Sequence, residues 1–295
     1  MSIELIKQLR EITLAGLSDC KEALLATNND LEKAIEYLRS NNKNVATKKA
    51  SRDTKHSISA IAVSEDFKLA YLIRISTETD FVSRNTVFAE LALNIAKHSL
   101  KYKTDDISKL LSSSSNYLNE HNLENYIENA ISKLGENIIL NEVIELNTSD
   151  SDSEYISYYV HGKSKNSLGE ILENVGSVIC AVGLKNYEAN INFDRLNNIG
   201  RDIGMHITAM KPLAVTPDSI SSELIAKEEA FLSKQVEEEF SNKPENVKLK
   251  ALEGRKAKFL KENALTMQQF CKDNSKTVGE YLSENKISIN WFKMI

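Results

Sequence analysis

The feature that most constrains the fold is a change of apolar periodicity between residues 67 and 96. From Phe67 to Ile75 every second residue is apolar, which is typical of a strand with one buried face. From Phe88 to Ala96 the apolar residues follow the spacing of one helical face. The stretch STETDFVSRN, residues 76–85, is therefore a strand-to-helix turn, and it is mostly polar except for the large apolar Phe81.

The role of Phe81 has two interpretations. Thr79, Asp80 and Asn85 can each cap the helix that follows, because short polar side chains accept hydrogen bonds from its free N–H groups. Capping therefore does not require an aromatic residue. Phe81 either folds back as a hydrophobic staple on the first helical turn, or it protrudes from a surface connection to bind a partner. The sequence pattern favours the staple and leaves the protruding side chain as the alternative.

Charge and cysteine content exclude several classes of protein. The formal net charge of −5 argues against a nucleic-acid-binding chain and favours a protein partner. Cys20, Cys180 and Cys271 lie far apart and have no neighbouring His or Cys at zinc-ligand spacing, so we expect no disulfide, metal or cofactor. The sequence has no apolar run long enough to span a bilayer, and its start resembles neither a signal nor a transit peptide, so we expect a cytoplasmic protein without membrane contact.

Residues 2–40 predict three short helices capped by Ser2, Ser18 and Asp30, a small docking unit of the ubiquitin-associated (UBA) type. A polar, basic stretch then predicts a linker, and two strand–turn–helix cycles predict an α+β core of two halves. A long helical hairpin follows, which we interpret as an association element. The expected parts are 1–41 (helical module), 42–56 (linker), 57–148 (first core half), 149–213 with 264–280 (second core half), 214–263 (hairpin) and 281–295 (C-terminal module).

The residues themselves indicate no active site. HGKSKNS resembles the end of a phosphate loop, but Ser157 stands where that motif requires Gly, and no helix follows. His161, Cys180 and Asp194 could be combined into a hydrolase triad. However, Cys180 falls within a continuous apolar run, where a buried filler is the more frequent role. A multi-part binding surface is the better interpretation, and we expect no enzyme.

Seven motifs in order along the chain carry a specific resemblance. They are LAGLSDCKEAL, TETDFVSRN, KLGENI, YVHG, GMHITAMKP, EGRKAKFL and SKTVGEYL. Together they resemble the bacterial elongation factor Ts family over essentially the whole sequence. The resemblance implies a UBA-like module, a two-subdomain α+β core with small antiparallel sheets, an inserted helical dimerisation hairpin and a C-terminal module.

The resemblance also implies a function, namely nucleotide exchange on elongation factor Tu in its GDP-bound and nucleotide-free forms during translation elongation. It places Thr79, Asp80, Phe81 and Val82 near the partner's magnesium and phosphate site. It allows a homodimer through the hairpin. The runner-up is a non-catalytic adaptor or scaffold that binds its partner without releasing nucleotide. Further implied contact residues are Lys21, Leu134, Gly135, His161, Phe270, Cys271 and Lys272.

Overall fold

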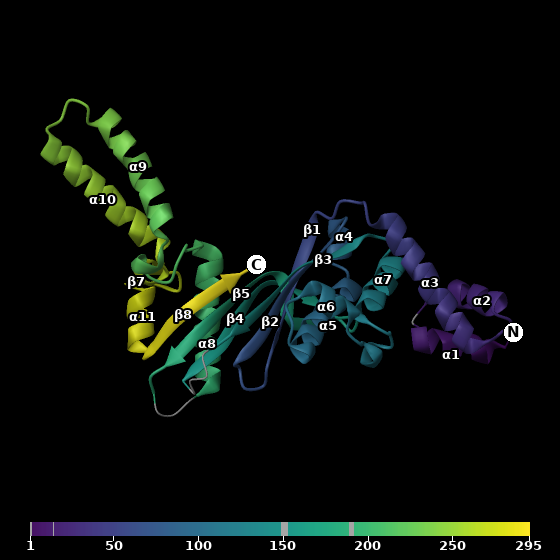
Figure 1. Ribbon diagram of the computed structural model, residues 1–295. Coiled ribbons are helices and arrows are strands. Elements are labelled where there is room, and N and C mark those ends of the chain that lie inside the picture. The colour runs from purple at the N-terminus through teal and green to yellow at the C-terminus, as the bar shows by residue number, and fades with distance from the viewer. Residues whose placement is uncertain (1, 14, 149–152, 189–191) are drawn as a thin grey trace. The chain divides into compact units, whose positions relative to one another are not determined.

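The computed structural model describes residues 2–13, 15–148, 153–188 and 192–295, which form two compact units (Figure 1). Unit 1 comprises Met1–Asn147, Val160–Ile179 and Ile295, and unit 2 comprises Thr148–Tyr159 and Cys180–Met294. Helices and antiparallel strands occur in both, so the predicted α+β class is confirmed. Among the described residues, no helix combines the length and the apolar character that crossing a bilayer requires.

Three helices begin unit 1: α1 (Ile3–Thr13), α2 (Leu17–Ala26) and α3 (Leu31–Lys49). The predicted caps at Ser2 and Asp30 are confirmed, since Ser2 Oγ accepts from Leu5 N at 3.1 Å and Asp30 Oδ1 accepts from Lys33 N at 3.1 Å. The prediction for Ser18 is wrong: Gly16 is the N-cap of α2, and no side chain caps that end. The helices enclose a small core of Leu9, Cys20, Ala23, Leu24, Ala34 and Leu38.

Helix α3 is longer than the sequence predicts. It continues to Lys49, so the expectation of an unstructured linker is wrong for residues 42–49. The physical reason is tertiary packing, because Val45 and Ala46 pack against the main core of unit 1. Two apolar residues among polar neighbours give no recognisable period, yet their burial is enough to extend a helix that has already begun.

The sheet of unit 1 has the strand order β3-β2-β1-β5-β4. Three of its strands are β1 (His56–Val63), β2 (Leu69–Thr77) and β3 (Ile138–Asn147), and both pairings among them are antiparallel. Tyr71, Ile73 and Ile75 of β2 are buried with Phe88 and Leu91 of the helix that packs on the sheet. The predicted alternation thus gives one core face of β2, but the expectation of a single buried face is wrong, because Ala70 and Leu72 on the other face are fully buried as well. The remaining elements are α4 (Asp80–Ser83), α5 (Thr86–Tyr102), α6 (Ile107–Ser112), η1 (Asn116–Leu118) and α7 (Leu123–Leu134).

Two long strands, β4 (Glu154–Lys165) and β5 (Ile171–Asn186), contribute to both units. In unit 2, β5 pairs antiparallel with β8 (Ile287–Met294). Residues 287–294 of the expected C-terminal module are therefore a strand of this sheet. Helix α8 (Phe193–Met210) packs closely on it, because a Cβ at Gly200 would lie 2.3 Å from Ser157 Cβ and one at Gly204 would lie 2.7 Å from Tyr159 Cβ.

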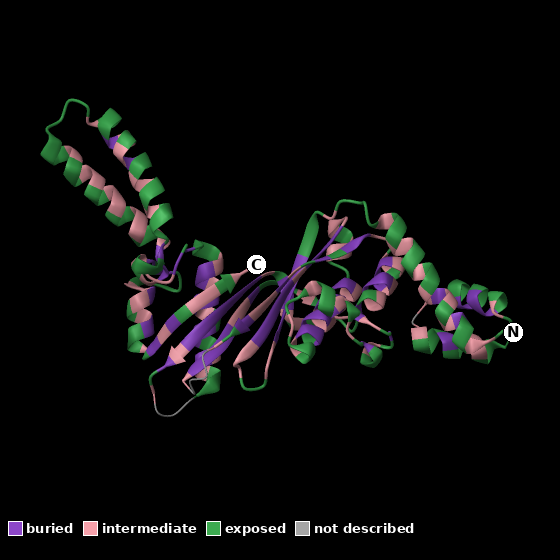
Figure 2. Ribbon diagram, viewed as in Figure 1, coloured by how far each residue is buried: buried purple, intermediate pink, exposed green. Residues whose placement is uncertain are grey.

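The helical hairpin of unit 2 is confirmed as α9 (Ser222–Glu239) and α10 (Glu245–Asn263). Only Leu232 and Val236 of α9 are buried, and no residue of α10 is. Figure 2 shows the same contrast, with buried residues concentrated on the strands and few on the hairpin. The remaining elements of unit 2 are η2 (Pro217–Ser219), η3 (Leu265–Met267), β6 (Gln269–Phe270), β7 (Asp273–Thr277) and α11 (Val278–Glu284).

Candidate functional site

The turn between β2 and α5 forms a separate one-turn helix, α4. Thr79 is its N-cap, and its side chain accepts a hydrogen bond from Val82 N at 3.4 Å. Asn85 caps α5, because its Oδ1 accepts from Val87 N at 2.8 Å. Asp80 caps neither helix. Its carboxylate lies 3.6 Å from the guanidinium of Arg84, in an exposed ion pair of the kind that contributes little stability.

Phe81 protrudes from this turn. Its exposed fraction is 82%, so the staple interpretation is wrong and the protruding alternative holds. Val82 takes the inward position instead, since it packs against the core of unit 1. One turn of helix cannot direct two consecutive side chains inward, and Phe81 is the one left in solvent. The result is an exposed aromatic ring next to a packed residue.

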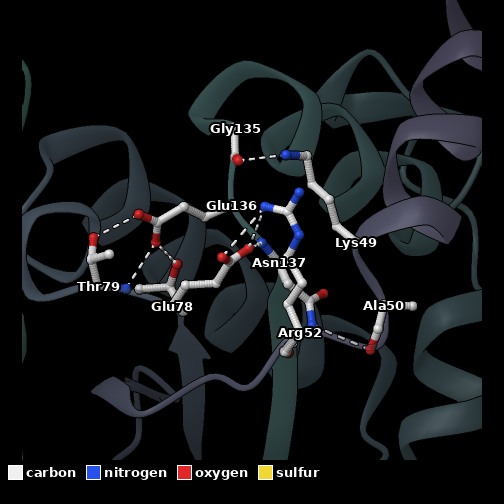
Figure 3. A network of polar contacts seen from close by, with 9 residues as sticks. Lys49, Ala50, Arg52, Glu78, Thr79, Gly135, Glu136 and Asn137 are labelled. Carbon is white, nitrogen blue, oxygen red and sulfur yellow. Dashed lines mark hydrogen bonds and ion pairs between the residues drawn. The ribbon is translucent and has the colours of Figure 1, made fainter.

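The carboxylate of Glu136 holds the start of this turn (Figure 3). Its Oε1 accepts from Thr79 Oγ1 at 2.6 Å, and its Oε2 accepts from Thr79 N at 3.0 Å and from Thr77 Oγ1 at 2.8 Å. Partial burial raises the pKa of Glu136, but the hydrogen bonds from Thr79 and Thr77 outweigh burial and leave the pKa below its ordinary value. The group is therefore a carboxylate at neutral pH, and it can only accept hydrogen bonds.

The residues on either side of Glu136 join the turn to the end of α3. Asn137 N donates to Glu78 Oε1 at 2.6 Å, and its side-chain Nδ2 donates to the carbonyl of Arg52 at 2.9 Å. Lys49 Nζ donates to the carbonyl of Gly135 at 2.6 Å. Figure 3 shows these contacts converging on residues 135–137. The stretch that follows α7 therefore braces both the β2–α4 turn and the C-terminal end of α3.

Four other predicted contact residues lie in unit 1. Lys21 of α2 and His161 of β4 are exposed. Gly135 ends α7 with φ 76°, in the left-handed conformation that favours glycine, whereas Leu134 is half-buried against the core. Of these four, Gly135 and Leu134 are joined to the Phe81 turn through the next residue, Glu136.

The predicted contact segment 270–272 lies in unit 2, and its three residues differ in exposure. Phe270 is 2% exposed and stacks on Tyr281 with ring centroids 4.4 Å apart, so it anchors the segment. Cys271 and Lys272 are exposed. The backbone N–H of Cys271 donates to His206 Nδ1 at 3.2 Å. Burial lowers the pKa of His206, which keeps the ring neutral and able to accept that hydrogen bond.

The hydrolase alternative is not supported by the geometry. Cys180 is fully buried within β5, and burial raises the pKa of its thiol to about 12, which leaves almost no thiolate at neutral pH. Within the part of the chain that the structure describes, no cluster of three or more His, Cys, Asp or Glu residues is arranged to hold a metal ion.

Sequence reasoning missed the residues that brace the turn, namely Glu78, Glu136 and Asn137. The signal that was present is the order of KLGENI, in which a carboxylate and an amide directly follow the glycine that ends a helix. The pattern fixes where the helix ends, but the partners of these side chains lie far earlier in the chain, 57 residues for Thr79 and Glu136 and 85 residues for Arg52 and Asn137.

Comparisons with known proteins give a consistent result. A family model described as "Elongation factor TS" matches residues 78–295, and one described as "UBA/TS-N domain" matches residues 16–38. Elongation factor Ts of Ehrlichia ruminantium (strain Welgevonden) is 36% identical over 286 residues, which is 97% of this chain and 93% of that protein. Elongation factor Ts of Aquifex aeolicus (strain VF5) is 35% identical over 294 residues, covering 98% and 94% of the two chains.

Proposed function

The chain belongs to the elongation factor Ts family, and we propose that it releases GDP from elongation factor Tu by inserting the Phe81 turn at the partner's magnesium and phosphate site. Family membership makes it a cytoplasmic nucleotide exchange factor for elongation factor Tu. Exchange changes no covalent bond, so the chain is not an enzyme. The proposal concerns which residues act on the partner and how.

The observation that carries the proposal is the exposure of Phe81 on a braced turn. A ring that is 82% exposed has most of its apolar surface available for a partner. Val82 packs into the core beneath it, and Glu136 accepts hydrogen bonds from both the N–H and the hydroxyl of Thr79. Buried aromatic anchors of this kind dominate many interfaces, at about 2 kcal/mol or more each.

The physics of exchange explains why a rigid anchor is needed. A GTP-binding protein holds GDP through backbone amides and a Mg²⁺ ion that bridges phosphate and protein oxygens. A factor that binds the nucleotide-free form more tightly must weaken nucleotide binding by the same ratio. Typical couplings of about 1–3 kcal/mol give only about 5- to 150-fold, so strong exchange needs an inserted side chain together with remote contacts.

The remote contacts in this proposal come from the other predicted residues. Lys21 of the module at 1–41, Leu134 and Gly135 after α7, His161, and the segment 270–272 would bind surfaces of the partner away from the nucleotide. Several such patches raise the effective concentration of Phe81 at its target. In this division of the chain, the first core half at 57–148 would carry the Phe81 turn. The second core half, at 149–213 with 264–280, would carry the contact segment 270–272, and the C-terminal module at 281–295 would complete this second contact surface.

The hairpin at 214–263 has a separate proposed role, which is to pair two copies of the chain. Phe231, Val247 and Leu249 on its two helices are exposed apolar residues, and an isolated two-helix hairpin cannot cover both apolar faces. Sedimentation equilibrium of the free protein tests this role, since a monomer at micromolar concentration would contradict it.

The exchange proposal is tested by stopped-flow release of a fluorescent GDP analogue from loaded elongation factor Tu. Phe81→Ala and Asp80→Ala should both slow release at a saturating concentration of factor. A wild-type rate for Phe81→Ala would by itself contradict the insertion of the ring, although the chain would remain an exchange factor that acts through other residues.

A further inference from the structure

We infer that Glu136 is a positioning residue for nucleotide exchange, which acts by fixing the Phe81 turn through Thr77 and Thr79. The inference rests on the proposed function of Phe81. It assigns a role to a residue that touches neither Phe81 nor the partner site directly, and that lies 55 positions away from Phe81 in the sequence.

Helix α4 is too short to be stable by itself. The helix consists of four residues, Asp80–Ser83, which is a single turn. Forming one turn fixes several backbone dihedral angles for very few internal hydrogen bonds, and an isolated turn is therefore unstable in water. Some external restraint must select the conformation that directs Phe81 outward and Val82 inward.

Glu136 supplies this restraint at the N-cap of α4. Thr79 is the N-cap, and its backbone N–H and hydroxyl both donate to Glu136, at 3.0 and 2.6 Å. The same hydroxyl accepts from Val82 N at 3.4 Å. Because the hydroxyl of Thr79 donates its hydrogen bond to the carboxylate, its oxygen lone pairs are directed toward the helix, and Glu136 thereby orients the cap.

The backbone that carries Glu136 is held on both sides. Gly135 ends α7 in the left-handed conformation, and its carbonyl accepts from Lys49 at 2.6 Å. Asn137 is almost fully buried, and its backbone N–H donates to Glu78 at 2.6 Å. The carboxylate therefore extends from a backbone position that is fixed on both sides, and it holds Thr77 and Thr79 from that position (Figure 3).

The main test is a double-mutant cycle with Glu136→Gln and Phe81→Ala, measured as the rate of GDP-analogue release from loaded elongation factor Tu. The glutamine keeps the size of the side chain but faces one of the Thr donors with another donor. We expect Glu136→Gln to lower the saturating rate about tenfold, as for the loss of a hydrogen bond to a charged group. In the Phe81→Ala background the same substitution should have no further effect, because Glu136 acts through that ring.

The outcomes separate the inference from the proposed function. A slow Phe81→Ala with a wild-type rate for Glu136→Gln overturns the inference alone. A tenfold effect of Glu136→Gln that persists in full in the Phe81→Ala background also overturns it, because Glu136 would then act by another route. A wild-type rate for Phe81→Ala overturns the proposed function, and the inference with it.

A purely structural role for Glu136 gives a different signature. Partial unfolding removes active molecules, so it raises the concentration of factor needed for half-saturation but leaves the saturating rate unchanged. The inference requires the reverse, with a lower saturating rate and a half-saturating concentration changed less than about threefold, since the remote contacts are intact. Glu65→Gln, at an exposed carboxylate in the β1–β2 turn, is the matched control and should behave as wild type.

A second pair of variants covers the case in which Glu136→Gln does not fold. Thr77→Val removes a hydroxyl that donates to Glu136 but keeps the shape, whereas Thr77→Ser keeps the hydroxyl. We expect Thr77→Val to lower the saturating rate and Thr77→Ser to restore it to within about twofold of wild type. Equal rates for the two variants would overturn the inference.

Discussion

Replacing Phe81 with Ala separates the energy of binding from the energy of folding. The side chain is 82% exposed, so its removal takes little from the core, and we expect the free energy of unfolding to change by less than about 0.5 kcal/mol. Full burial of a large apolar side chain is worth about 1.5–3 kcal/mol. With 82% of the surface still available, the loss on binding should be about 2 kcal/mol, or about 30-fold in the equilibrium constant.

The assay measures two quantities on the same variant. Stopped-flow release of a fluorescent GDP analogue gives the exchange rate, and titration of nucleotide-free elongation factor Tu gives the affinity of the complex. Leu168→Ala is the matched control, because Leu168 lies in the β4–β5 turn of the same unit and is 81% exposed. It should lose neither exchange nor stability.

Two results would refute the proposed binding role of Phe81. One is an exchange rate and an affinity within about twofold of wild type, which would mean that the exposed ring finds no pocket on the partner. The other is an equal loss in Leu168→Ala, which would mean that exposed apolar area in general, rather than this turn, accounts for binding. A fall in the thermal midpoint of several degrees would also contradict the assignment of Phe81 as free of core contacts.

Three further predictions concern chemistry away from the turn. In the native protein at pH 8, a thiol reagent should react with the exposed Cys271 but not with Cys180, whose pKa burial raises to about 12; reaction of Cys180 before unfolding would contradict this. Burial lowers the pKa of His98 from 6.5 to about 4. The free energy of unfolding in urea should therefore contain a contribution of about 3 kcal/mol that is complete above pH 6.5 and is lost as the pH falls toward 4. A His98→Gln variant should lack this pH dependence. Thr277→Ala removes a capping box and should lower the free energy of unfolding by about 1 kcal/mol by chemical denaturation.

Local signals predicted much of the fold. The alternation over 67–75 predicted the face of β2 on which Tyr71 and Ile73 are fully buried, although the strand begins only at Leu69 and its other face, with Leu72, is buried too. The caps at Asp30, Asn85 and Thr277 and the left-handed Gly135 were likewise predictable, because each depends on a side chain or backbone only a few residues away. Most of the confirmed predictions rest on interactions within one turn of chain, although the cap at Ser18 and the staple by Phe81 are local predictions that are wrong.

The predictions from the sequence are wrong or missing where contacts between residues far apart in the chain determine the structure. The linker expected from residue 42 is helical to Lys49 because Val45 and Ala46 contact a core built from later strands and helices. Phe81 does not form the staple because Val82 occupies the inward position. The sequence pattern does not distinguish between these two neighbouring apolar residues. The role of Glu136 cannot be read from the sequence, because Glu136 follows α7 whereas its donors, Thr77 and Thr79, lie at the end of β2 and in the turn after it.

The order of the Phe81 turn follows from the energetics of exchange. If residues 79–82 were mobile before binding, ordering the backbone of these four residues would cost about 1–2 kcal/mol per residue in conformational entropy, or roughly 4–8 kcal/mol in all. That cost exceeds the coupling of about 1–3 kcal/mol typical between two ligands of one protein. A loose turn would thus lose on ordering more than Phe81 gains from a pocket, and the complex would form without displacing nucleotide. The hydrogen bonds that Thr77 and Thr79 donate to Glu136 order the turn when the protein folds, so this entropy is not lost again on binding. The free energy gained by burying the ring can then act against nucleotide binding.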